Sequence, residues 1–189
     1  MSIKSVYGLA VAGIVLVSCQ SDFYLIKGFA RQLQEGDTIC LAFGEPSERI
    51  LDKTIVSDGQ FTFSGNTDTT LFCRAYLQSN PTCTVSFFLE PGNIAMEINL
   101  PPKSSRVSGT RLNNNWQQLN DSIKLIGAQL IKLSKETGFT DESCNRSRFR
   151  AIDSLHRKMS ACIIHTARRN NDNALGRYID INYKEPKFK

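Results

Sequence analysis

The spacing of the apolar residues changes once along this chain, and that change divides it into two parts. From Phe23 to about Val107 the pattern repeats every two residues, as in Gln60-Phe61-Thr62-Phe63-Ser64, where phenylalanines alternate with polar residues. After Pro101-Pro102 the apolar residues recur at spacings of four and three, which places them on one face of a helix. Strands therefore precede helices, and the sequence predicts an α+β fold.

Seven short strands are expected in the first part, each bounded by turn residues. Ser57-Asp58-Gly59 predicts a tight hairpin turn with positive φ angles, and Pro91-Gly92 predicts a type II turn that accounts for its segment without a functional role for Glu90. Because no long helical segment separates the strands, parallel pairing is not expected. Residues 19–107 thus predict an antiparallel β-sandwich, with a partly open barrel as the alternative; the expected strands are 23–26, 38–43, 50–56, 60–64, 71–77, 85–89 and 94–98.

Residues 108–189 predict a helical hairpin followed by a short third helix. The first helix is expected from about Arg111 to Glu136, the second from about Asn145, and the third after the capping residues Asn171-Asp172-Asn173. Their apolar faces must pack on each other, on the sandwich or on a partner. Trp116 and Leu119 discriminate between these readings: exposed side chains would mark an interface, and buried ones would belong to the core.

The N-terminus predicts export and lipid anchoring. Lys4 precedes a 12-residue apolar run, Val6 to Val17, which is too short to span a bilayer, and the run ends in Leu16-Val17-Ser18-Cys19. This ending is the pattern at which bacterial lipoproteins are lipidated and cleaved. Residues 1–18 are therefore interpreted as a lipoprotein signal peptide, Cys19 as the lipidated residue, and the location as the membrane of the cell envelope. Gln20, in place of Asp, favours the outer membrane; which of its faces the protein occupies stays open.

Export also fixes the redox setting of the remaining five cysteines, because the compartment outside the cytoplasm is oxidising. Five is an odd number, so at least one thiol stays free or pairs between molecules, and the pairing is left open. No C-x-x-C motif occurs, and neither cysteine nor histidine spacing predicts zinc. Cys40 and Cys73 lie in apolar strand patterns and are expected to be buried; the others are Cys83, Cys144 and Cys162.

Positive charge gathers in the last quarter of the chain. Residues 19–145 contain 11 Lys and Arg against 14 Asp and Glu, whereas residues 146–189 contain 11 against 4. The basic residues of the second helix form either an ordinary solvated face or a surface for anionic headgroups, an acidic glycan or an acidic partner. Nucleic acid is not expected, since no aromatic residues stand among these arginines. With Trp116 and Leu119, the candidate interface residues are Arg146, Arg150 and Arg157.

No catalytic, cofactor-binding or metal-binding residues are predicted. His156 and His165 are nine positions apart, too far for a metal site on one helix face, and neither neighbours a nucleophile motif. The acidic residues of the strands and turns are expected to be solvated. The sequence predicts a scaffold without a reactive constellation.

Several segments together resemble an uncharacterised β-rich domain found at the N-terminus of bacterial thioredoxin-like, thiol:disulfide interchange lipoproteins. They are residues 57–65, 88–94 and 107–110 with Asn113 and Trp116, and residues 170–178, which are similar to the helix preceding the thioredoxin domain there. The resemblance implies a fold, a lipid anchor and an envelope location. The redox chemistry of that family belongs to the thioredoxin domain, whose C-x-x-C has no matching positions here.

The expected function is that of a lipid-anchored, non-catalytic binding or adaptor module with a protein or glycan partner and no cofactor. Two alternatives stay open. One is an accessory role in thiol–disulfide exchange beside a separate thioredoxin-like protein. The other is a truncated remnant of such a protein.

Overall fold

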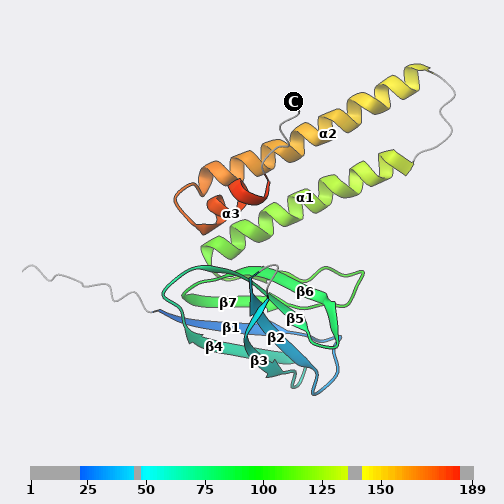
Figure 1. Cartoon of the computed structure of the whole chain (residues 1–189). Coiled ribbons are helices and arrows are strands. Elements are labelled where there is room, and N and C mark those ends of the chain that lie inside the picture. The colour runs from blue at the N-terminus through cyan, green and yellow to red at the C-terminus, as the bar shows by residue number, and fades with distance from the viewer. Residues whose placement is uncertain (1–21, 45–47, 136–141, 184–189) are drawn as a thin grey trace, which may run out of the picture.

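The computed structural model describes residues 22–44, 48–135 and 142–183, and within these ranges it contains eight strands followed by three helices (Figure 1). The predicted signal peptide and Cys19 lie outside the described residues. The strands are β1 (Phe23–Phe29), β2 (Thr38–Phe43), β3 (Arg49–Ile55), β4 (Gln60–Asn66), β5 (Leu71–Leu77), β6 (Asn80–Leu89), β7 (Gly92–Glu97) and β8 (Arg106–Ser108). The helices are α1 (Arg111–Lys135), α2 (Glu142–Arg169) and α3 (Ala174–Asn182). The α+β class with a C-terminal helical region is confirmed.

The strands form two four-stranded sheets, in the orders β4-β1-β7-β8 and β3-β2-β5-β6. The expectation of one seven-stranded antiparallel sandwich is wrong in two respects. β8 is an additional strand, too short to show a period of two. β1 and β7 pair in parallel, from Tyr24 opposite Gly92 to Phe29 opposite Glu97. No helical crossover is needed because strands β2 to β6 themselves carry the chain from β1 to β7.

Apolar side chains from both sheets meet in one core. Ile26 and Ile94, from neighbouring strands of the first sheet, are exposed by at most 1%, and so are Leu41 and Phe87 of the second sheet. The predicted hairpin turn is confirmed, since Asp58 and Gly59 have φ angles of +51° and +67° between β3 and β4. Burial of these apolar surfaces supplies the main favourable free energy of folding.

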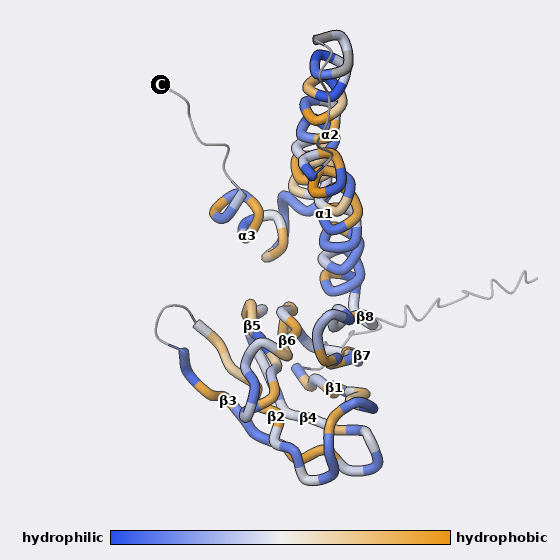
Figure 2. The backbone as a smooth tube through the Cα atoms, turned by 90° about the vertical axis from the view of Figure 1, so that its right-hand side faces the viewer, coloured by the Kyte–Doolittle hydropathy of each residue, from blue (hydrophilic) through white to orange (hydrophobic). Residues whose placement is uncertain are grey.

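The helices pack on one edge of the two sheets and extend beyond it. α1 rises from the sheet edge, α2 returns antiparallel to it as the outermost layer, and α3 tucks back toward the strands (Figure 1). Seen from the side, the α1–α2 hairpin stands above β7 and β8, and α3 stands above β5 (Figure 2). α1 begins at Arg111 and Asn173 caps α3, both as predicted. α2 begins three residues earlier than expected. Across the described residues, no helix combines the length and the apolar character that crossing a membrane requires.

Candidate binding surface at the junction of helix and sheets

The first two turns of α1 cover the open edge of a sheet. β6 is an edge strand, so its outward backbone groups need other partners. The Asn113 side chain accepts a hydrogen bond from Phe88 N–H and donates one to the Phe88 carbonyl, both at 2.8 Å. The Trp116 indole N–H donates to the Ser86 carbonyl, also at 2.8 Å. The helix thus acts as a substitute for a neighbouring strand.

An aromatic cluster holds α3 against the same place. The rings of Tyr178 and Phe72 lie 4.1 Å apart between centroids, and Trp116 lies edge-on to Tyr178 at 5.4 Å. Trp116 is 5% exposed and Leu119 is 2% exposed. Both are core residues of this chain, so their proposed role as interface residues is corrected: their side chains pack on the sheet and on the other helices and present no surface to a partner.

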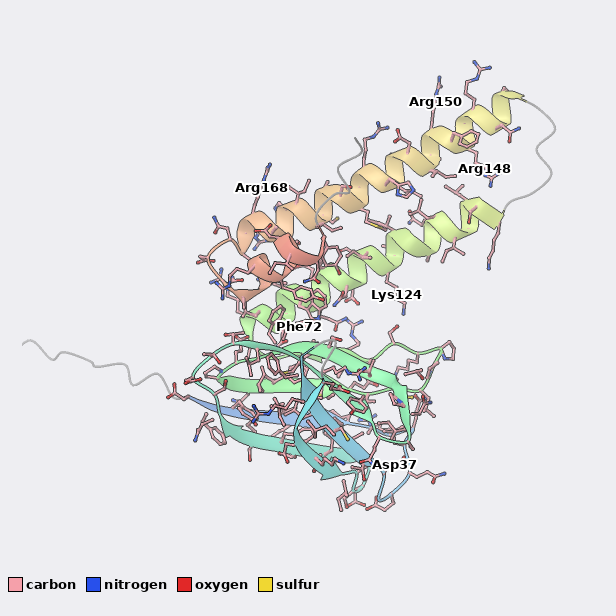
Figure 3. The ribbon with its side chains drawn as sticks, in the orientation of Figure 1. Asp37, Phe72, Lys124, Arg148, Arg150 and Arg168 are labelled. Atoms are coloured by element: carbon pink, nitrogen blue, oxygen red, sulfur yellow. The ribbon has the colours of Figure 1, made fainter. Side chains whose placement is uncertain are left out.

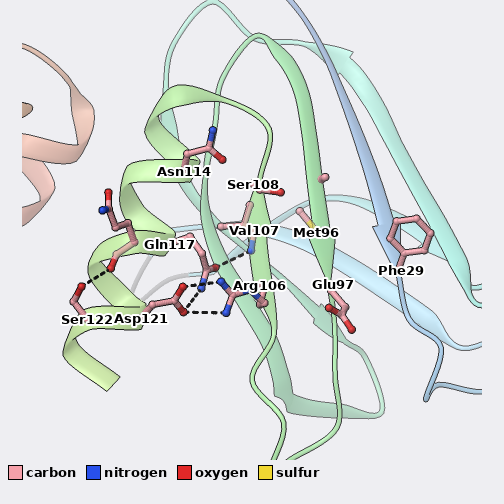
Figure 4. Close-up of a pocket in the computed structure, with 12 residues that line it drawn as sticks. Phe29, Met96, Glu97, Arg106, Val107, Ser108, Asn114, Gln117, Asp121 and Ser122 are labelled. Atoms are coloured by element: carbon pink, nitrogen blue, oxygen red, sulfur yellow. Dashed lines mark hydrogen bonds and ion pairs between the residues drawn. The ribbon is translucent and has the colours of Figure 1, made fainter. Parts of the chain in front are cut away.

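An open groove runs between α1 and the edge formed by β7 and β8 (Figure 4). Its volume is about 580 Å³. The Arg106 guanidinium on β8 donates two hydrogen bonds, of 3.0 and 2.6 Å, to the Asp121 carboxylate on α1. Gln117 donates to the same carboxylate and accepts from Val107 N–H. The lining consists mainly of polar side chains, namely Glu97, Arg106, Ser108, Asn114, Gln117, Gln118, Asp121 and Ser122, with Phe29, Ala95, Met96 and Val107 as its apolar part.

The two carboxylates of the groove are held in their ionised form. The hydrogen bond from Arg106 lowers the pKa of Asp121, and the same contact raises the pKa of Arg106. A hydrogen bond from Lys103 lowers the pKa of Glu97. Near neutral pH the groove therefore contains paired anions and cations and no carboxylic acid that could donate a proton.

Sequence reasoning did not single out this groove. Arg106 and Asp121 come from elements that are adjacent only in the folded chain. The one available signal was the i, i+4 spacing of Gln117 and Asp121, which places both on a polar side of α1 beside its apolar seam.

The predicted arginines of α2 separate into two groups. Arg146, Arg150 and Arg157 are exposed, and Arg157 pairs with Asp153 at 2.7 Å. Arg148 has a structural role that the sequence did not reveal. Its guanidinium donates to the carbonyls of Leu133 and Ser134, at 2.8 and 3.0 Å, and so satisfies the C-terminal end of α1.

The described cysteines are all free thiols. Cys40, Cys73 and Cys83 are buried, which confirms the expectation for the first two, and Cys162 is half-buried between α1 and α2. Burial raises the pKa of Cys73 to about 12. The side chain of Cys144 lies outside the described part of the structure. Within that part, no three His, Cys, Asp or Glu side chains gather into a group that could hold a metal ion.

Comparison with known proteins identifies a domain and no activity. Residues 24–116 match the sequence profile of a family described as "Domain of unknown function (DUF4369)". This segment runs from β1 to Trp116, the residue that caps β6, and so it contains the strands and the beginning of α1. The chain thus contains this uncharacterised domain. No curated protein matches the chain.

Proposed function

We propose that this chain is a lipid-anchored, non-catalytic binding module of the cell envelope, and that its protein or glycan partner occupies the groove between α1 and β8. The observation that carries the proposal is the groove itself: an open concavity of about 580 Å³ in which paired charges, amides and hydroxyls stand beside the apolar side chains of Phe29, Met96 and Val107. The polar groups form hydrogen bonds in both directions and fix the orientation of a polar ligand.

The construction of the groove supports binding without conformational rearrangement. Arg106 and Asp121 join β8 to α1 by two hydrogen bonds, and Gln117 adds a third link through Val107 N–H. Walls held in this way are preorganised, so a ligand loses little free energy in ordering them.

The charges favour binding over hydrolysis. Two carboxylates that cleave a glycosidic bond include one with a raised pKa, which supplies the proton. In the groove the pKa values of Glu97 and Asp121 are both lowered, by Lys103 and Arg106 respectively. These groups are suited to orient a ligand and not to protonate it.

A photo-crosslinking experiment tests the groove. Two variants of the mature lipoprotein carry a photoreactive amino acid, one in place of Gln118 and one in place of Gln129. Both glutamines are exposed on α1, but only Gln118 lines the groove. After irradiation of intact cell envelopes, we expect a discrete adduct from position 118 and none from position 129, and its mass distinguishes a protein from a glycan. Equal labelling from both positions, or no adduct at 118, refutes a partner in the groove.

The lipid anchor is supported by the apolar run and by the sequence Leu16-Val17-Ser18-Cys19. Mass spectrometry of the native protein tests it directly. We expect an N-terminal peptide that begins at Cys19 and carries acyl chains, and a Cys19→Ala variant that no longer fractionates with membranes. A native protein that retains residues 1–18 contradicts this part of the proposal.

The accessory role in thiol–disulfide exchange has less support. Exchange requires an accessible thiolate. Cys40, Cys73 and Cys83 are buried, and only Cys162 among the described thiols is half-exposed. A thiol count on folded, unreduced protein tests this role, because a protein with no reactive thiol cannot take part.

A further inference from the structure

Four arginines of α2 form a single stripe along the helix. Arg146, Arg150, Arg157 and Arg168 follow one another at intervals of four, seven and eleven residues. These intervals are close to one, two and three helical turns, so the four side chains leave the same side of α2. All four are exposed. The stripe spans 22 residues, about 33 Å at 1.5 Å per residue.

The stripe faces away from the rest of the molecule. α1 lies between α2 and the sheets, and Arg150 and Arg168 point outward whereas Arg148 points toward α1 (Figure 3). Among the α2 side chains that the structure describes, the carboxylate beside the stripe is that of Asp153, which pairs with Arg157 at 2.7 Å. Lys158 and Arg169 add two further exposed cations along its side. The face is therefore strongly positive.

Exposed apolar side chains lie along the same face. Ile164, 42% exposed, lies one turn before Arg168 on the same side of α2, and Phe149, 71% exposed, lies about 60° around the helix from Arg146, at the edge of the stripe. An acidic protein or glycan requires only the charges, whereas a bilayer surface also takes up apolar groups between its headgroups. The combination of both kinds of side chain on one face favours lipid.

We infer that the outer face of α2 docks on the anionic phospholipid headgroups of a bilayer. The inference rests on the proposed envelope location, and it names the surface against which the anchored protein lies. Acyl chains at Cys19 would hold the protein at the membrane, and a basic contact would fix which face of the protein lies against the headgroups. The stripe is several times longer than the Debye length at physiological salt, about 8 Å, so the charges at its two ends are screened from one another.

The test uses the mature chain with Cys19→Ser, which retains every described element and has no lipid anchor. Its binding to vesicles of phosphatidylcholine alone and of phosphatidylcholine with phosphatidylglycerol is measured by co-sedimentation. We expect binding to the anionic vesicles only, weakening with salt. The variant Arg150→Gln, Arg157→Gln, Arg168→Gln should bind them about 100-fold less tightly, from roughly five-fold per arginine near an anionic surface. Adding Phe149→Ala to this triple variant should weaken binding to the anionic vesicles further.

A charge-matched control separates the stripe from net charge. The variant Lys27→Gln, Lys53→Gln, Arg111→Gln removes three exposed cations from β1, β3 and α1 and should lose at most a few-fold in affinity. Thermal unfolding confirms that both triple variants are folded. Equal losses in both, equal binding to neutral vesicles, or no binding to anionic vesicles each overturn the inference. Because the Cys19→Ser protein has no anchor, a negative result in this vesicle test does not bear on lipidation at Cys19. That question is decided separately by the mass of the native N-terminus.

Discussion

Replacement of Asn113 by alanine tests whether α1 holds the sheet edge through its side chain. Asn113 is fully buried, and its amide makes three hydrogen bonds of 2.8 Å, two with the backbone of Phe88 and one with the Thr110 hydroxyl. The Asn113→Ala variant leaves the N–H and the carbonyl of Phe88 without partners in a buried position. A buried polar group left unpaired costs about 1–3 kcal/mol. The expected loss in the free energy of unfolding is therefore about 2–5 kcal/mol, a large part of the 5–15 kcal/mol typical of a domain.

Urea unfolding of a chain that begins at Gln20 measures this loss with two probes. Trp116 is the only tryptophan in the sequence and lies at the junction, so its fluorescence reports on the contact between α1 and β6. Far-UV circular dichroism reports on the helices as a whole. In Asn113→Ala we expect the fluorescence transition to move to lower urea than the dichroism transition, because the junction opens before the distal hairpin unfolds.

Two further variants sharpen the test. Asn114→Ala is the control, since Asn114 is exposed and its side chain accepts one hydrogen bond, from Gly109 N–H; the variant should lose less than about 1 kcal/mol. Asn113→Asp keeps the shape and the acceptor for Phe88 N–H but, when ionised, has no donor for the Phe88 carbonyl. Its deficit should shrink as the pH falls and the acid becomes a donor. A loss below about 1 kcal/mol in Asn113→Ala, equal to that of the control, refutes the edge-covering role.

The remaining predictions concern a carboxyl group, a glycine and the thiols. Burial raises the pKa of Glu90, and its Oε1 has no hydrogen-bond partner in the described structure. The contribution of Glu90 to the free energy of unfolding is therefore present at low pH and is lost as the pH rises through the folded pKa. Glu90→Gln should therefore exceed the parent in unfolding free energy at about pH 7 and match it at about pH 3 in urea titrations. In Gly176→Ala the new Cβ would stand 2.0 Å from the Asn170 carbonyl oxygen, and overpacking of this kind costs about 1–3 kcal/mol, measured by urea unfolding. In native protein Cys162 should react with a maleimide much faster than Cys73, whose pKa of about 12 leaves on the order of one thiolate in 10⁴ at about pH 8; equal rates contradict the burial of Cys73.

The elements that the sequence predicted well are those encoded by neighbouring residues. The turn at Asp58 and Gly59, the start of α1 at Arg111 and the cap at Asn173 each depend on a few adjacent side chains. Asn173 illustrates this, since its side chain accepts hydrogen bonds from the N–H groups of Leu175 and Gly176. Such contacts join residues only two or three positions apart, so the local sequence is enough to predict them.

The features that the sequence did not predict depend on residues far apart along the chain. The parallel pairing of β1 with β7 is set when five intervening strands close around a shared core. Asn113 is a polar residue in a helix, a pattern that favours exposure, yet it is buried because an open strand edge needs its amide. Arg148 caps α1 from the opposite helix of the hairpin. No local pattern indicates any of these roles.

The extent of the matched domain bears on both proposals. The match over residues 24–116 ends at Trp116, whose indole completes the cover of β6. The matched segment thus contains its sheets together with the cover for their open edge, and the rest of the hairpin is an addition that rejoins the sheets through Tyr178. The groove lies across this boundary, since Arg106 is inside the match and Asp121 outside it, whereas the stripe on α2 lies wholly in the addition. Binding in the groove and docking on lipid are therefore separable, and variants of the stripe should leave crosslinking from position 118 unchanged when the lipid at Cys19 is present.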